Sequence, residues 1–527
     1  MSTTSLPSAS TPSASAPSAS APSASTPSAS TPSASAPSAP LPRRRPNAEF
    51  YRKQAKALLK AARAGNGEAI ARFRRFLPRP GGEAGPLPEA IGLHDAQRVL
   101  AREHGFDTWP RFHAALFASD APAKRFRPHV RGFAWYEQRV AGVIGVHASG
   151  FSDSLQAIRA HHPRFASASD DEIRAAPFTE DDARLVLARE HGCDDWDAFR
   201  QHVVAIEAGR SVEPFTLAFD AIQSGSAAEL ATLLAQHPDL INAQGTNGST
   251  LLNLAGSLRQ PALCRLLLDH GADVDLPTTR GVTPLHQAAY SNQPDLIELL
   301  IGAGASPEAH AYGEGGTPLC MALFWGHDAA REKLAAYAVT PPNLRVCAGV
   351  GRLDLLAACF DAQGALTHEA AALRGFYRPH TGFPPWVPKS ERRELLNEAL
   401  VYASRNGQLA ALGALLARGA DIDADPYRGT ALTWAAFSGH GEAVRWLLDH
   451  GAAIDHQATF GGPGHGEGVA AIHMAANAGQ LAVVQLLVER GASLTLRDGM
   501  HGGNALGWAT FHGQTAVREY LEPLTPK

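Results

Sequence analysis

The sequence predicts an all-α protein whose larger part is a solenoid, a stack of similar helix pairs. Two short patterns recur in step. The first is TPLHQAA, residues 283–289, with a near-copy opening at Thr317 and weaker copies opening at Thr250, Thr430, Ala470 and Asn504. The second is Gly-Ala after a leucine-rich stretch, with the glycines at positions 271, 304, 419, 451 and 491. The threonines at 250, 283 and 317 lie 33 and 34 residues apart, and such a fixed period is typical of repeat architectures.

The residues of one unit explain why it folds into two helices. Thr283 can cap the first helix with its hydroxyl, and Pro284 suits the first helical position, where no backbone donor is needed. The second helix, rich in leucine and isoleucine, ends before Gly304, which tolerates a left-handed backbone. One unit cannot bury its apolar face alone, so the units must stack on their neighbours.

The motif and its period resemble the ankyrin repeat, a β-turn followed by two helices. The resemblance covers residues 213–527 and implies a curved stack that presents a groove to another macromolecule. This sequence departs from the family by replacing the motif proline at four positions, Leu251, Ala431, Ala471 and Ala505.

Composition and repeats divide the chain into five predicted parts. They are a Pro/Ser/Ala low-complexity tail at 1–46, a duplicated helical module at 47–212 with copies at about 47–128 and 129–212, repeats at 213–363, a Pro/aromatic-rich insertion at 364–392, and repeats with a C-terminal cap at 393–527. The tail has almost no apolar bulk, so we expect it to be disordered. It is either a basic-flanked tether or a targeting signal, because Ser-rich, acid-free N-termini resemble those of bacterial secreted effectors and, less closely, transit peptides.

The duplication is visible in the sequence. The phrase DAQRVLAREHG at 95–105 returns as DARLVLAREHG at 182–192, an offset of 87, and Tyr51 returns as Tyr136, an offset of 85. Both copies are predicted to be helical, and the phrase resembles a module of bacterial ankyrin-repeat proteins to which no activity is assigned. His104 and His191 fall in the last turn of a helix, where the helix dipole favours them, so we interpret them as structural rather than catalytic.

The insertion at 364–392 contains FYRPH and FPPW, which are too rich in proline for a helix and too aromatic for an ordinary surface loop. We expect it to be ordered against the solenoid. If the chain were an enzyme, its site would be built here with Glu369, Arg378 and His380.

Candidate binding residues follow from the resemblance. In ankyrin proteins the two residues after the Ala-Ala of the first helix face the groove. The matching positions that carry an aromatic ring or an arginine give the predicted partner-binding set: Tyr290, Phe324, Trp325, Arg405, Phe437 and Phe511. Tyr, Trp and Arg dominate binding energy at many interfaces. The alternative is that these side chains pack between repeats or under the insertion. Trp434 and Trp508 are predicted to be core, and His286 and His473 to tie neighbouring turns together.

Composition and motifs exclude several classes of function. The five cysteines are scattered and never spaced as CxxC, which predicts reduced, mostly buried thiols and no zinc site. No catalytic motif or phosphate-binding loop occurs, so we expect a protein that is not an enzyme and has no cofactor or metal. No apolar run is long enough to span a bilayer, and no secretory signal opens the chain, so we expect a soluble, cytoplasmic protein, with secretion by a signal-peptide-independent route left open.

Charge is distributed unevenly. Residues 1–135 hold 19 Lys+Arg against 8 Asp+Glu, and the rest holds 28 against 43, which gives about +11 and −15. The basic front, including Arg72, Arg74 and Arg75, could contact nucleic acid, but no nucleic-acid-binding motif accompanies it. The function predicted from the sequence is therefore a non-catalytic protein-interaction scaffold. The alternatives are a secreted bacterial effector that binds a host protein and, less favoured, a nucleic-acid-associated protein. The sequence decides neither the partner nor the oligomeric state.

Overall fold

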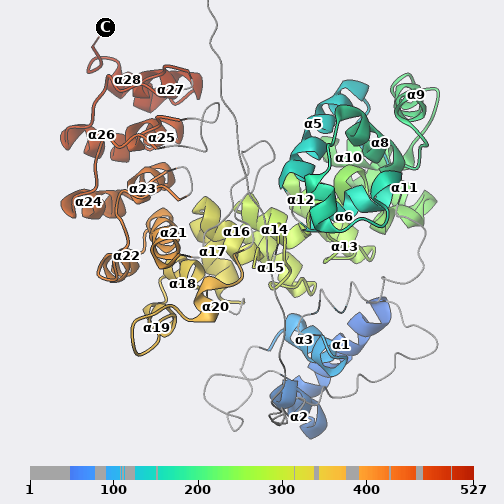
Figure 1. Cartoon of the computed structure of the whole chain (residues 1–527). Helices are drawn as coiled ribbons and strands as arrows, with labels where there is room; N and C mark the ends of the chain where they lie inside the picture. Colours follow the sequence, from blue (N-terminus) through green and yellow to red (C-terminus); the bar gives the residue numbers. More distant parts are fainter. Residues whose placement is uncertain are drawn as a thin grey trace, which may run out of the picture. The chain divides into compact units, whose positions relative to one another are not determined.

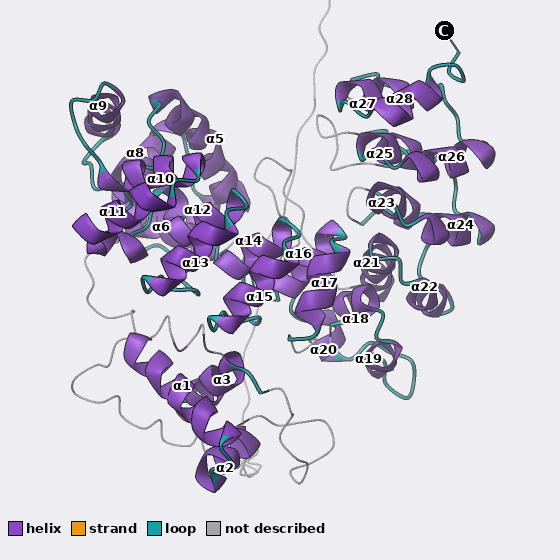
Figure 2. Cartoon of the chain, turned by 180° about the vertical axis from the view of Figure 1, so that it is seen from behind, coloured by secondary structure: helices purple, strands orange, loops and turns teal. Residues whose placement is uncertain are grey.

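A computed structural model of the chain describes residues 48–76, 91–106, 109, 112, 125–149, 152–313, 315–337, 343–374, 391–426, 429–458, 467–499 and 501–526. Within these ranges the chain is helical, and only four isolated β-bridges occur (Figure 2). The predicted all-α class is thus confirmed. The tail at 1–46 lies outside the described residues, as do 375–390 of the predicted insertion.

The front of the described chain consists of two helical groups with matching elements (Figure 1). The first contains α1 (Ala48–Arg63), α2 (Gly67–Phe76) and α3 (Leu93–Glu103), and the second contains α5 (Phe133–Ser149), α6 (Ser152–His161), α7 (Asp170–Ala175), α8 (Glu180–Glu190) and α9 (Trp196–Glu207). In each group the three helices at matching sequence positions contact one another: α1, α2 and α3, and α5, α6 and α8.

The rest of the described chain contains nine helix pairs. They are α10 (Pro214–Ser224) with α11 (Ala227–Gln236), α12 (Leu251–Ser257) with α13 (Pro261–Asp269), α14 (Pro284–Tyr290) with α15 (Pro294–Gly302), α16 (Pro318–Trp325) with α17 (Asp328–Ala335), α18 (Leu344–Val350) with α19 (Leu353–Ala358), α21 (Arg392–Arg405) with α22 (Leu409–Leu416), α23 (Ala431–Ser438) with α24 (Gly441–Asp449), α25 (Ala471–Asn477) with α26 (Leu481–Glu489), and α27 (Ala505–Phe511) with α28 (Thr515–Leu521). One short helix, α20 (His368–Ala371), lies between the fifth and sixth pairs. The stacking of the last four pairs can be followed in Figure 1.

The first helix of each pair is fixed by the residues that the motif supplies. Thr283 caps α14 with a hydroxyl that accepts a hydrogen bond from the backbone N–H of His286 (3.4 Å), and Pro284 opens the helix. Leu285 and the alanines at 288 and 289 are fully buried. Full burial of a leucine side chain contributes roughly 1.5–3 kcal/mol, so the stacking of these faces stabilises the pairs.

Polar contacts repeat from one pair to the next. His286 donates from Nε2 to the carbonyl oxygen of Gly316 (2.9 Å), and His473 donates to that of Leu496 (3.0 Å). Burial lowers the pKa of His286 to about 4, so the ring is neutral and donates from one nitrogen only. Both histidines therefore tie neighbouring turns together, as predicted.

The turns between pairs need glycine at specific places. Gly281 has a φ of +78°, and a Cβ added there would overlap the backbone carbonyl of His310 in the next turn. Gly271 has a φ of +88°, but a Cβ added there would meet nothing. A left-handed backbone costs a non-glycine residue about 1–2 kcal/mol, and overpacking costs about 1–3 kcal/mol more.

We therefore expect Gly281→Ala to lower the free energy of unfolding by about 3 kcal/mol and Gly271→Ala by about 1 kcal/mol. Chemical denaturation followed by circular dichroism would measure both. Equal losses at the two positions would contradict the close approach of successive turns.

The regular order breaks between α17 and α21. The start of the predicted insertion is held against the repeats: Arg374 forms an ion pair with Glu398 of α21, and Arg345 of α18 donates to the carbonyl oxygen of Leu373 (3.4 Å). Glu398 is 1% exposed. Residues 364–374 are thus ordered against the solenoid as expected, while Arg378 and His380 lie outside the described residues and Glu369 is exposed.

The front groups are joined to the repeats by ion pairs. Arg98 pairs with Glu308 (3.0 Å), Arg131 with Asp220, and Arg127 with Asp239. The hydroxyl of Thr216 also donates to the carbonyl of Pro128 (2.9 Å). Part of the basic charge of the front therefore faces acidic groups of the repeats. Across the described helices, none is long and apolar enough to cross a membrane.

Candidate protein-interaction surface

Six side chains near the C-terminal ends of the first helices form one continuous row. We call Tyr290, Trp325, Phe324, Arg405, Trp434 and Phe437 the aromatic row. The ring centroids of Tyr290 and Trp325 are 5.5 Å apart, and those of Trp325 and Phe324 are 5.3 Å apart. Further along, the ring centroids of Trp434 and Phe437 are 5.7 Å apart. The row thus runs across α14, α16, α21 and α23, although 140 residues lie between the end of the first of these helices and the start of the last.

Arg405 joins the two halves of the aromatic row. Its guanidinium carbon lies 4.5 Å from the ring centroid of Phe324 and 3.6 Å from that of Trp434. The same guanidinium donates to the backbone carbonyl of Phe324. A cation held between two aromatic faces is stabilised by their quadrupoles, and more strongly when water is excluded. Arg405 is only 1% exposed, so it acts as a clamp between α16 and the repeats that follow.

Two of the predicted partner-binding residues must be reassigned for this reason. Phe324 is 7% exposed and Arg405 is 1% exposed, so neither is within reach of a partner. The prediction had assigned both residues to the groove from their position in the repeat motif alone. Because α16 contacts α21 directly across the irregular pair α18–α19, side chains at the ends of these two helices pack against each other. The alternative interpretation, packing between repeats, describes these two residues.

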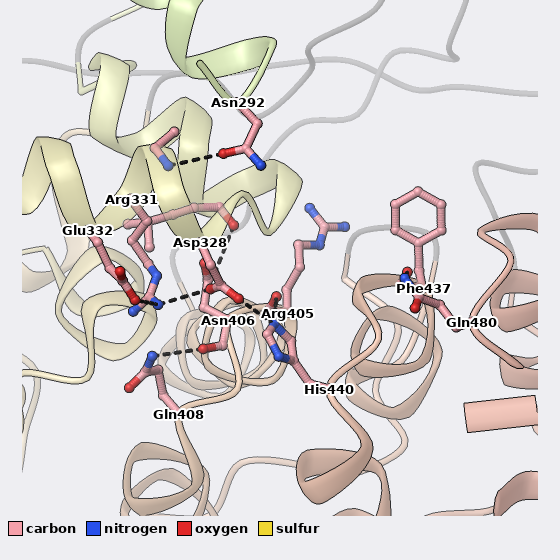
Figure 3. A network of polar contacts seen from close by, with 12 residues as sticks. Asn292, Asp328, Arg331, Glu332, Arg405, Asn406, Gln408, Phe437, His440 and Gln480 are labelled. Atoms are coloured by element: carbon pink, nitrogen blue, oxygen red, sulfur yellow. Dashed lines mark hydrogen bonds and ion pairs between the residues drawn. The ribbon is translucent and has the colours of Figure 1, made fainter. Parts of the chain in front are cut away.

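Hydrogen bonds from side chains of one repeat to backbone carbonyls of an earlier repeat hold the helix ends that carry the row. The residue that opens each second helix donates to the carbonyl at the end of the preceding repeat's first helix: His327 to Tyr290 (2.9 Å), His440 to Arg405 (3.0 Å) and Gln480 to Phe437 (3.3 Å). His440 also lies 3.8 Å from the carboxylate of Asp328. Figure 3 shows Asp328, His440 and Gln480 of this network, with Arg405 and Phe437 extending towards the same side.

The remaining predicted residues are accessible to different degrees. Tyr290 is 42% exposed, whereas Trp325 and Phe437 are half-buried. Phe511 is 86% exposed on α27, and in the described chain its ring lies beside that of His512 (5.1 Å between centroids) rather than beside a residue of the row. The structure therefore brings together five of the six predicted residues and leaves Phe511 apart. It adds Trp434, which is buried as predicted for a core residue.

Sequence reasoning missed His327 and His440 as supports of the row. Both stand before the second helix, where other repeats carry Gln293, Gln480 and Gln514 with the same bond to the preceding repeat. The recurrence of a hydrogen-bonding side chain at this position was the available signal. In the part of the chain that the structure describes, no group of three or more His, Cys, Asp or Glu side chains is arranged to hold a metal ion.

Comparisons with known proteins match the repeats. A family model described as "Ankyrin repeats (3 copies)" matches residues 218–311 and 387–459, and one described as "Ankyrin repeat" matches residues 467–499. Ankyrin repeat and SAM domain-containing protein 6 is 44% identical in rat and 42% in mouse over 57 residues, 11% of this chain and 6% of each relative. Ankyrin repeat and KH domain-containing protein mask-1 of Caenorhabditis elegans is 34% identical over 102 residues, 19% of this chain and 4% of the relative.

The chain therefore matches 6% or less of the length of each of these relatives. Among solved structures, the human ASB11 ankyrin repeat domain is 23% identical, with a TM-score of 0.28, over 52% of this chain and 98% of that chain. The relatives are animal proteins, so a bacterial origin and a duplicated front module remain predictions. The stacked helix pairs and the two family models agree on the same conclusion: residues 218–311, 387–459 and 467–499 of this chain are ankyrin repeats.

Proposed function

We propose that this protein is a non-catalytic protein-interaction scaffold whose partner binds along the exposed edge of the aromatic row. Ankyrin repeats in general support protein–protein interaction. The observation that carries the proposal is that Tyr290, Trp325 and Phe437, contributed by three separate repeats, are joined into one row by the buried Phe324, Arg405 and Trp434. Aromatic side chains that are held rigid and partly exposed supply large contact area at little entropic cost.

The surroundings of the row favour a partner with apolar and basic side chains. The carboxylate of Asp328 is 46% exposed, and that of Glu332 is 74% exposed. Both belong to α17, and Asp328 lies beside His440 (Figure 3). The chain from residue 136 onward carries a net charge of about −15. A partner that places Lys or Arg at the rim and an apolar side chain on the rings would complement this surface.

Hydrogen bonds to backbone carbonyls hold the proposed binding surface in place before a partner binds. His327, His440 and Gln480 fix the helix ends from which Tyr290, Arg405 and Phe437 project. Binding therefore requires little ordering of the surface, and preorganisation of this kind raises affinity.

Removing the exposed rings is the test of the proposed function. We expect Tyr290→Ala and Phe437→Ala each to weaken partner binding by about 2 kcal/mol, roughly 30-fold, as hot-spot residues do. The partner set would be captured from the native host with the wild-type chain and quantified by mass spectrometry, and the affinity of each reproducible partner would then be measured.

Phe511→Ala is the matched control, because Phe511 is an exposed aromatic residue outside the row. It should leave the partner set and the affinities unchanged, and circular dichroism should show that all three variants keep the helical content of the wild type. If Tyr290→Ala and Phe437→Ala capture the same partners with the same affinities as Phe511→Ala, the aromatic row is not the binding surface.

A further inference from the structure

The two front groups differ at one partly exposed ion pair. In the first group, the guanidinium of Arg72 on α2 donates two hydrogen bonds of 2.6 Å to the carboxylate of Glu103, the last residue of α3. The offsets that relate the two sequences, 85 for α2 with α6 and 87 for α3 with α8, place Ala157 at the position of Arg72 and Glu190 at that of Glu103. The second group therefore retains the acid but lacks its basic partner.

Glu190 is buried without a substitute for that arginine. It is 5% exposed, and its carboxyl group forms no hydrogen bond or ion pair with any residue in the described ranges. Burial raises the pKa of Glu190 to about 8, so near pH 7 the group is mostly a neutral acid that can donate a hydrogen bond.

A cavity of about 320 Å³ occupies the space beside Ala157 and Glu190. Its walls come from α5, α6 and α8 on one side and from the turns of the first repeats on the other. Ligand pockets for small molecules begin at about this size, on the order of 300 Å³. The cavity lies where the second group lacks the arginine side chain of the first group, because both Ala157 and Glu190 line it.

Two arginines without a carboxylate partner among the described residues line this cavity. Arg139 of α5 and Arg280 of the turn before α14 both line it, and neither forms an ion pair with any side chain that the structure describes. Arg139 lies over the ring of Trp135, 4.8 Å from its centroid, and Arg280 over that of Tyr312, 6.0 Å from its centroid. Partial burial and the charge of Arg280 lower the pKa of Arg139, so an anion between the two arginines would relieve their repulsion.

Neutral hydrogen-bonding groups complete the lining. Ser249 and Thr278 contribute hydroxyl groups from the turns, and Gln287 contributes an amide from α14, whereas the Thr279 hydroxyl already donates to the carbonyl of Asn247 (3.2 Å). Planar guanidinium groups bind phosphate and carboxylate through paired hydrogen bonds. A phosphate ester carries close to two negative charges and three terminal acceptor oxygens, which matches two arginines together with several neutral donors.

We infer that the cavity between α5, α6, α8 and the first repeat turns binds a small molecule bearing a phosphate group, with Arg139 and Arg280 as the groups that hold the phosphate. The site is independent of the aromatic row. A bound ligand would hold the second front group to the repeats, because Arg139 belongs to that group and Arg280 belongs to a repeat turn.

Isothermal titration calorimetry in phosphate-free buffer at constant ionic strength tests the site, with ribose 5-phosphate, inorganic phosphate, ribose and succinate as probes. We expect ribose 5-phosphate to bind more tightly than inorganic phosphate, and ribose not to bind. Arg139→Ala and Arg280→Ala should each weaken binding about tenfold or more, since hydrogen bonds to charged groups are the strong ones. Ala157→Arg should abolish binding by filling the cavity and pairing with Glu190 as Arg72 pairs with Glu103.

Arg74→Ala is the control, since it removes an exposed positive charge from the first group without touching the cavity and should leave binding unchanged. Three results would overturn the inference. They are no heat from either phosphate probe up to about 10 mM, the weak end of specific binding; binding that survives both arginine substitutions; and succinate binding as tightly as ribose 5-phosphate. Circular dichroism of the two arginine variants, whose positions are exposed or half-exposed, separates loss of binding from loss of fold.

Discussion

Replacing Arg405 with alanine is expected to lower the free energy of unfolding by about 3 kcal/mol or more, and to do so at one junction of the solenoid. The substitution removes a charged hydrogen bond to the carbonyl of Phe324 and a guanidinium held between the rings of Phe324 and Trp434, and it leaves a cavity. Each of these effects costs about 1–3 kcal/mol in buried sites. Repeats are stabilised by their neighbours, so a weakened junction uncouples the pairs on its two sides.

Hydrogen exchange measured by mass spectrometry would locate this loss. Protection should fall first in α16 and α21, and denaturation should separate into two steps if the repeats before and after the junction unfold independently. Arg445→Ala is the matched control: Arg445 pairs with Glu442 on the exposed surface of α24, and surface pairs of this kind contribute within about 0.5 kcal/mol. A loss spread evenly over all repeats, or one no larger than for Arg445→Ala, would show that Arg405 is not a clamp.

The same residue shows how far the sequence could predict the site. The motif placed Arg405 at the end of a first helix, together with Tyr290 and Phe437, and the structure finds all three there. What the motif could not give was the order of stacking around the irregular part of the chain. Because α21 contacts both α16 and α23, the Arg405 side chain that should face the groove is covered by Phe324 of α16 and Trp434 of α23. Exposure depends on which helix lies next in space, and the local pattern does not contain that information.

The fold could be predicted where the conformation that a residue favours locally is also the one that stacking of the repeats requires. The Thr-Pro start of α14, the inward leucine and alanines, and the bridging role of His286 each follow from the residue and its position in the unit. The cavity beside Ala157 is the opposite case. It arises from one small residue at a place where the related segment carries an arginine, and its other wall comes from repeat turns 90 or more residues later. Only the folded chain brings these two walls together.

Glu190→Gln is expected to raise stability, which is uncommon for a substitution in a core. The carboxyl group has an ordinary pKa of 4.5 and a pKa of about 8 in the folded chain, because burial disfavours its ionised form. Between these values the unfolded chain releases the proton and the folded chain keeps it, so the free energy of unfolding falls as pH rises from about 4.5 to about 8. Glutamine does not ionise, so it removes this penalty, on the order of 3 kcal/mol at pH 7.

The difference between variant and wild type across pH isolates this effect, because the buried histidines titrate alike in both proteins. Urea denaturation should show little or no gain for Glu190→Gln near pH 5 and a gain that grows up to pH 8. Glu103→Gln provides the comparison within the same chain, since Glu103 is paired with Arg72, and its loss should cost about 1 kcal/mol instead of adding stability. A pH-independent difference for Glu190→Gln would mean that the carboxyl group is hydrated or paired in solution. The cavity would then lack the neutral donor on which part of its preference for phosphate rests, whereas the contributions of Arg139 and Arg280 would be unaffected.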